Sequence, residues 1–207
     1  MQLFSAEQRR SQALEAHAAA FSTVQLADGT SVPVIAFAQK TATSSKLHVV
    51  QLGANASGAP PLKKSAELFF PPEFADDFPV SLHVSERFGL VYVVTKMGLL
   101  FVYDLATGAA VYRNRVSADP VFLAVPCSST GGIYLVNRRG QVLHATLNEA
   151  AVVPFVANQL HNVELALALA KRGGLPGADA LAAANFERLC AAGDFKAAAS
   201  AAAESPR

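Results

Sequence analysis

Cysteine is scarce in this chain of 207 residues, which contains only Cys127 and Cys190. Neither has a second cysteine or a histidine at close spacing, so the sequence offers neither a disulfide framework nor the ligand spacing of a zinc site. Two sparse thiols are typical of the reducing cytosol. We therefore expect a cytoplasmic protein without a structural metal or cofactor.

An excess of charge of one sign is also absent, because 17 lysines and arginines face 16 acidic residues and leave a formal net charge of +1. Basic residues form no run longer than a doublet, as at 9–10, 63–64 and 138–139, whereas nucleic-acid surfaces need larger basic clusters. No stretch approaches the roughly 20 continuous apolar residues of a membrane span, and no signal-peptide pattern follows Met1. We expect no nucleic-acid partner, and contact with membranes only through other proteins.

Catalytic motifs are missing as well. The chain has no P-loop, no nucleophile elbow and no dinucleotide-binding glycine pattern. Glu73, Asp76 and Asp77 form an acidic group in a predicted loop, where turn capping is favoured over acid–base chemistry. The five histidines are scattered without ligand spacing: His17, His48, His83, His144 and His161. We predict that the protein is not an enzyme and has no catalytic, cofactor-binding or metal site.

What the sequence does have is a repeated run of short apolar strands. Residues 90–112 and 132–153 show the same layout of strands and tight turns. Asp77 and Asp119 open the two units and lie 42 residues apart, and the turn glycines Gly98 and Gly140 have the same spacing. A four-stranded repeat of roughly 40–45 residues is typical of a β-propeller blade. With a looser copy from about residue 17 to 70, the chain contains about three blades, the last without a clear outer strand.

After Pro154 the pattern changes to helical spacing. Three helices are predicted between residue 163 and the end of the chain. The first ends on glycines, the second carries Leu181, Phe186, Leu189 and Cys190 on one stripe, and the third has Asp194 as its N-cap. Helices alternating with short turns are typical of an α-solenoid. The predicted fold class is mainly β followed by α: a partial propeller over residues 1–153 and a helical linker over 154–207.

The sequence resembles clathrin heavy chain over essentially its whole length. The runs that carry this resemblance include LFFPPE (68–73), DFPVSLHVSE (77–86), VVTKMGLLFVYDLATG (93–108) and ELALALAKRGGLPGADAL (164–181). The resemblance implies the last blades of a seven-bladed propeller, followed by the first helices of a zigzag leg. It also implies a fragment or an incomplete gene prediction. Three blades alone would leave two open sheet edges, which favour aggregation.

A structural role in the clathrin coat is what the resemblance implies, in intracellular protein transport, vesicle-mediated transport and endocytosis. The implied partners are adaptor proteins that dock short peptide motifs, the remainder of the heavy chain and, through segments missing here, the light chain and trimer partners. The implied location is coated pits and vesicles, at the plasma membrane or the trans-Golgi network. An alternative also stays open: a stand-alone propeller–solenoid module that binds peptides without building a coat.

One adaptor groove of the family falls partly within this chain. It lies between the fourth and fifth blades and binds a hydrophobic arrestin-type motif. Leu3, Gln12 and Leu14 resemble the matching positions, while Gln8 stands where the family commonly has arginine. In this interpretation the leucines form an apolar pocket and Gln12 bonds a peptide backbone. The alternative, that Leu3 and Leu14 belong to the blade core, remains open at this point.

Overall fold

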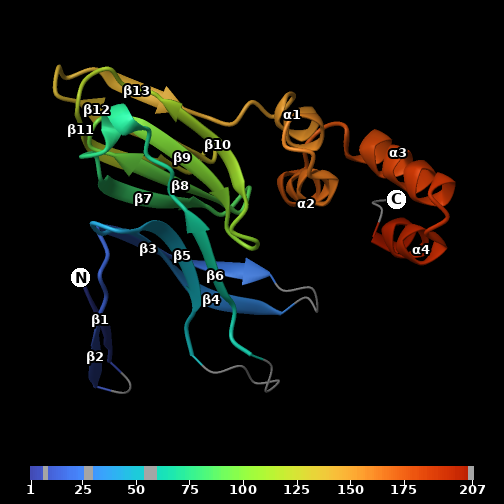
Figure 1. Ribbon diagram of the computed structural model, residues 1–207, viewed down its shortest axis with the longest axis horizontal. Helices are drawn as coiled ribbons and strands as arrows, with labels where there is room; N and C mark the ends of the chain where they lie inside the picture. The colour runs from blue at the N-terminus through green and yellow to red at the C-terminus, as the bar shows by residue number, and fades with distance from the viewer. Residues whose placement is uncertain (7–8, 26–29, 54–59, 205–207) are drawn as a thin grey trace. The chain divides into compact units, whose positions relative to one another are not determined.

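The computed structural model describes residues 1–6, 9–25, 30–53 and 60–204 (Figure 1). The chain divides into two compact units, residues 1–146 and 147–207. The first unit is built from strands and the second from helices. This order confirms the predicted fold class of β structure followed by α.

The first unit consists of antiparallel sheets whose strands follow one another in chain order (Figure 1). A hairpin precedes two four-stranded sheets and one three-stranded sheet among the described residues. The strands are β1 (Gln2–Ser5) and β2 (Arg10–Ala13); β3 (Ala18–Gln25), β4 (Ser31–Lys40), β5 (Ser45–Gln51) and β6 (Lys63–Glu67); β7 (Pro79–Ser85), β8 (Leu90–Thr95), β9 (Leu99–Asp104) and β10 (Ala110–Arg115); and β11 (Val121–Cys127), β12 (Gly132–Asn137) and β13 (Val142–Ala145).

Successive sheets pack through their first strands, since β3 contacts β7 and β7 contacts β11. This is how propeller blades are arranged, each with its first strand innermost. The sheet of β11–β13 has no fourth strand among the described residues, as the sequence predicts. Every residue of β8 and β9 is buried, because the middle sheet has a neighbouring sheet on each side. The run LVYVVT (90–95) is almost wholly apolar and predicts an inner strand buried on both faces, which the burial of β8 confirms.

The LFFPPE run (68–73) lies in the connection between β6 and β7. The run AELFF (66–70) predicts a strand that the two following prolines end, but this extent is wrong, because β6 ends at Glu67 and a short 3-10 helix follows at Pro72–Phe74. Phe70 turns inward and packs against Phe101, with ring centroids 5.4 Å apart. Four phenylalanines of this connection each lie under a cation, and such pairs fix side chains at partly exposed sites: Phe69 with Arg113, Phe70 with Lys40, Phe74 with Arg115 and Phe78 with Lys96.

Asp77 occupies the first position of the 42-residue repeat and is 2% exposed. One of its carboxylate oxygens accepts hydrogen bonds from the backbone N–H groups of Phe78, at 2.8 Å, and Met97, at 2.9 Å. The other accepts from the hydroxyl of Thr95. The Asp77 carboxylate therefore caps the turn that follows β8 and joins it to the start of β7.

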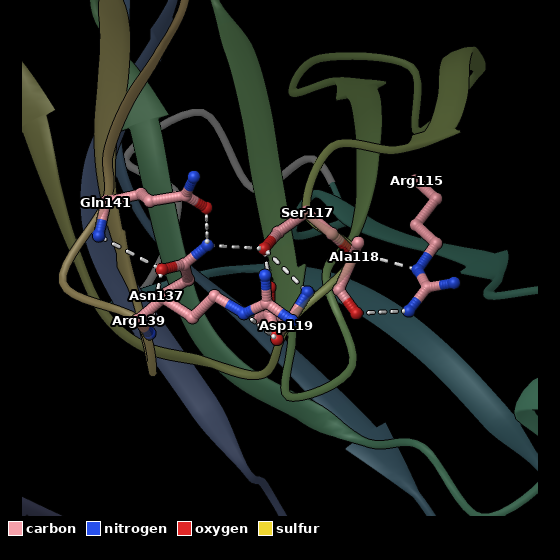
Figure 2. Close-up of polar contacts among 7 residues, drawn as sticks. All are labelled: Arg115, Ser117, Ala118, Asp119, Asn137, Arg139 and Gln141. Carbon is pink, nitrogen blue, oxygen red and sulfur yellow. Dashed lines mark hydrogen bonds and ion pairs between the residues drawn. The ribbon is translucent and has the colours of Figure 1, made fainter.

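In the β11–β13 sheet, Asn137 caps the turn that follows β12, as Asp77 caps the turn that follows β8. Figure 2 shows Asn137 between Ser117 and Gln141, where it is 1% exposed. Its Oδ1 accepts from the backbone N–H groups of Arg139 and Gln141, both at 3.1 Å. Its Nδ2 donates to Ser117 Oγ at 3.2 Å and to Gln141 Oε1 at 2.8 Å. Asp119 instead pairs with Arg139 Nε at 3.1 Å.

Replacing Asn137 by alanine is expected to lower the free energy of unfolding by about 2–3 kcal/mol, because the part-buried backbone N–H groups of Arg139 and Gln141 lose their acceptor and Ser117 Oγ loses one of its donors. Urea denaturation measures this change. Arg139→Ala is the control, since its ion pair lies at the surface, where such pairs contribute about 0–1 kcal/mol. Equal losses in the two variants would show that Asn137 does not hold the turn.

The contact between the second and third sheets contains a histidine. His83 of β7 is half-buried, with Nε2 3.0 Å from the carbonyl oxygen of Ala124 on β11 and 2.7 Å from Ser81 Oγ. Burial lowers the pKa of His83, and the hydrogen bond to Ala124 opposes this in part. The folded protein therefore favours the neutral imidazole at this sheet–sheet contact.

Acidification is expected to destabilise the first unit. Because the pKa of His83 is lower when folded, the unfolded chain binds its proton first as pH falls below about 6.5. The free energy of unfolding should be unaffected by His83 above that pH and fall below it. Urea denaturation at pH 7.5 and 5.5 measures this, and His83→Gln should show a smaller difference between the two pH values. An unchanged difference would contradict this role of His83.

The second unit contains four helices among the described residues: α1 (Val152–Asn158), α2 (Val163–Gly173), α3 (Ala178–Ala191) and α4 (Phe195–Glu204). Each packs on the next, the arrangement of an α-solenoid. The sequence predicted only three, because α1 was hidden by Pro154. Proline is tolerated there, in the first turn, where its missing N–H has no intrahelical partner.

The end of α2 and the start of α4 lie where the sequence predicts them, whereas the buried residues of α3 are not those of the predicted apolar stripe. Gly174 ends α2 at a positive φ of 59°, and Asp194 Oδ1 accepts from Ala197 N at 3.0 Å as the cap of α4. Three residues of the predicted apolar stripe on α3, Leu181, Leu189 and Cys190, are half-buried, whereas Phe186 is 40% exposed. The buried residues of α3 are instead Ala182 and Asn185, since small side chains let neighbouring helices approach.

Candidate functional site

A groove of about 1040 Å³ lies in the first unit beside the β1–β2 hairpin. One wall is the hairpin and the other is the face of the β3–β6 sheet that does not contact β7. We call it the hairpin groove. Its volume is at the upper end of the roughly 300–1,000 Å³ typical of ligand sites.

Three of the four residues predicted from the sequence line this groove. Leu3 and Gln12 are direct cross-strand partners in the hairpin. The N–H of Leu14 bonds the carbonyl of Met1 at 2.9 Å, which continues the same register. Because residues two apart on a strand share a face, Leu3, Gln12 and Leu14 lie on one face. All three line the groove, and Gln8 lies outside the described residues.

The two leucines are only half-buried, and neither belongs to the buried core of the first unit. Gln12 is exposed, as are all residues of β2. An apolar side chain on each side of an exposed amide provides both contact area and a hydrogen-bonding group. This is the combination expected of a surface that holds a peptide.

The opposite wall comes from residues of the β3–β6 sheet that no sequence motif indicated. Ile35 and Phe37 of β4 alternate with the buried Val34, Ala36 and Ala38 on the other face. Ile35 pairs in register with Phe21 on one side and Val50 on the other, and all three line the groove. The alternation pattern of VPVIAFAQ (32–39) did indicate this wall, because the side chains that alternate to the two faces of the strand are apolar on both faces. Such a strand predicts contacts on two faces.

Polar groups surround the apolar wall. Gln39 Nε2 of β4 donates to Glu15 Oε2 at 3.0 Å, which links the sheet to the segment after the hairpin. His48 stacks on Phe37 with ring centroids 4.9 Å apart. Burial and the nearby charges of Lys46 and Lys63 lower the pKa of His48. The groove thus presents a neutral imidazole at neutral pH.

Two exposed phenylalanine side chains line the groove. Phe4 of the hairpin and Phe21 of the sheet both line it, and each is 64% exposed. Exposed large apolar side chains gathered at a hollow mark interaction surfaces. Within the described ranges, no group of three His, Cys, Asp or Glu side chains is placed to hold a metal ion, and no helix is long and apolar enough to cross a membrane.

Comparisons with known proteins give one consistent result. The family described as "Clathrin, heavy-chain linker" matches residues 149–172, and "Clathrin-H-link" matches residues 174–207. Clathrin heavy chain 2 of Oryza sativa subsp. japonica is 56% identical over 213 residues, which covers 100% of this chain and 12% of the relative. Clathrin heavy chain of Drosophila melanogaster is 42% identical over 209 residues, with the same two coverages.

This chain resembles clathrin heavy chain throughout its length. The resemblance drawn from the sequence motifs is confirmed, and it extends across both the sheets and the helices. The chain spans about 12% of the length of the clathrin heavy chains that it matches. Among solved structures, the β-propeller domain of Myceliophteria thermophila Cps50 (Swd1) is similar with a TM-score of 0.36 and 13% identity over 51% of this chain and 32% of that one.

Proposed function

We propose that this chain is a segment of a structural coat protein of the clathrin type, which acts in intracellular protein transport, vesicle-mediated transport and endocytosis. The observation that carries the proposal is the whole-length similarity, 56% identical to a clathrin heavy chain across all of this chain. The role is structural and not enzymatic. The protein works in the cytoplasm, at coated pits and vesicles of the plasma membrane and trans-Golgi network, and reaches the membrane through adaptors.

Within that coat, the sheets up to about residue 153 form the last blades of a propeller, and the helices from about residue 154 begin the leg. One face of the β11–β13 sheet is consistent with a propeller that has further blades. Cross-strand pairing places four large apolar side chains on this face. These side chains are between 38% and 67% exposed: Leu123, Val125, Tyr134 and Val142. An apolar face of this kind is suited to packing against another blade. The remaining heavy chain, the light chain and the trimer partners complete the assembly.

The hairpin groove docks a short hydrophobic peptide motif of adaptor proteins in this proposal. Leu3 and Leu14 contact apolar side chains of the motif, together with Ile35 and Phe37 across the groove. Gln12, exposed between the two leucines, bonds the peptide backbone. Hydrogen bonds to the main chain supply affinity, and the apolar pocket supplies the preference for the motif.

A direct test is fluorescence titration of the 207-residue protein with a labelled peptide that carries a hydrophobic arrestin-type motif, beside a scrambled peptide of the same composition. The proposal predicts saturable binding of the motif at micromolar concentrations, the usual range of short linear motifs, and at least tenfold weaker binding of the scrambled peptide. Equal binding of the two peptides would contradict motif docking.

A further inference from the structure

A second groove lies in the helical unit and is not used by the proposed function. It has a volume of about 650 Å³ and is lined by side chains of α2, α3 and α4 together with Asp194, which precedes α4. We call it the helical groove. All of its lining residues belong to the second unit, so it does not depend on the sheets. Its volume falls within the roughly 300–1,000 Å³ of ligand sites.

The wall of the helical groove is made largely of small side chains. Leu167 and Leu189 are half-buried there and provide its larger apolar contacts. Because alanine has no side chain beyond Cβ, a bound main chain is able to approach the helices closely. The alanines that line the groove are Ala168, Ala178, Ala182, Ala197 and Ala201.

A buried amide lies among these small residues. Asn185 of α3 lines the groove and is 8% exposed. Its Oδ1 accepts a hydrogen bond from the Arg188 guanidinium at 2.9 Å. In the part of the chain that the structure describes, Nδ2 has no acceptor. Nδ2 is not among the buried polar atoms without a partner, so it reaches solvent at the groove, where an amide N–H is able to donate to a backbone carbonyl of a bound peptide.

Charge at the helical groove favours an acidic ligand. Lys171, Arg188 and Lys196 line it and are exposed. Among the described residues, none of the three has a carboxylate within 4.0 Å. Of the two acids that line the groove, Asp194 caps α4 through Ala197 N at 3.0 Å. Glu164 lies in the first turn of α2, where the helix dipole stabilises a negative charge.

We infer that the helical groove docks an extended acidic segment of another protein, in which carboxylates alternate with apolar side chains. The carboxylates pair with the three cations, the apolar side chains contact Leu167 and Leu189, and a backbone carbonyl accepts from Asn185 Nδ2. This site is separate from the hairpin groove and does not rest on the proposed function.

The test uses the 207-residue protein and three labelled twelve-residue peptides, built from four repeats of Ser-Glu-Leu, Ser-Gln-Leu or Ser-Lys-Leu. Fluorescence anisotropy should show that the glutamate peptide binds at least tenfold more tightly than the lysine peptide, with the glutamine peptide between them. The variant Lys171→Glu combined with Lys196→Glu should weaken binding of the glutamate peptide at least tenfold. Arg172→Glu, next to Lys171 but outside the groove lining, should weaken it less than threefold.

A filling variant locates the bound peptide. Ala168→Trp places a large side chain in the groove and should weaken binding at least tenfold. Ala183→Trp, at an exposed position of α3 outside the groove lining, should leave binding unchanged within twofold, and circular dichroism checks that both variants keep their helices. Three results would each overturn the inference: no binding of the glutamate peptide up to about 1 mM, equal binding of the acidic and basic peptides, or binding that Ala168→Trp leaves unchanged.

Discussion

Gly98→Ala is expected to lower the free energy of unfolding by about 3–4 kcal/mol, because two penalties add. Gly98 follows β8 at a φ of +87°, where a Cβ is strained. A Cβ at this position would also collide with the carbonyl oxygen of Ser117 and approach Ser117 Cβ to 3.0 Å. Relief of that collision would disturb the hydrogen bond from Val116 N to the carbonyl of Gly98, now 2.8 Å. Urea denaturation followed by circular dichroism measures the loss.

Gly140→Ala is the matched control, since Gly140 is the same turn position one repeat later. Its φ is +77°, yet a Cβ added there would meet no described atom within 4 Å. Only the backbone strain remains, which costs about 1–2 kcal/mol. A loss for Gly98→Ala no larger than that for Gly140→Ala would show that the close approach of Ser117 does not constrain the junction between the second and third sheets.

Leu3→Asp is expected to weaken binding of the hydrophobic arrestin-type peptide more than tenfold. The change removes half-buried apolar contact area from the hairpin wall and places a charge beside the apolar side chains of Ile35 and Phe37. Loss of one well-packed apolar side chain costs about 1.5–3 kcal/mol, and desolvation of the carboxylate adds to this. The same peptide titration measures the effect.

Gln2→Asp provides the control. The substitution adds the same charge to the same strand, but Gln2 does not line the groove. It should change the dissociation constant less than twofold. Gln12→Ala should weaken binding about threefold to tenfold, as expected for one lost hydrogen bond. If Leu3→Asp and Gln2→Asp weaken binding equally, the peptide does not occupy the hairpin groove.

The sequence was most informative where one residue decides a backbone conformation or where a whole strand is apolar. The 42-residue spacing of Gly98 and Gly140 predicted two equivalent turns, and both glycines have positive φ. The apolar run at 90–95 predicted a strand buried on both faces, and every residue of β8 is buried. These features depend on local chemistry that a single sequence displays directly.

The candidate groove was only half predictable. Leu3, Gln12 and Leu14 were proposed through family resemblance, and the hairpin register aligns them on one face. The opposite wall of Ile35 and Phe37 was missed, because both faces of β4 are apolar and only tertiary packing decides which face meets β7. Turn capping was predicted for the acidic group that includes Asp77, whereas the capping role of Asn137 was missed. Side-chain hydrogen bonds depend on distances that spacing alone does not give.

The most direct test of the coat assignment is an immunoblot of source cells, after soluble and vesicle fractions are separated, with an antibody raised against residues 78–115. If this chain is part of a clathrin-type coat protein, the antibody should detect a very large band, many times the 21.7 kDa of this chain, that is enriched with the vesicles. A single band near 21.7 kDa that stays in the soluble fraction would contradict the coat function and favour a free peptide-binding module.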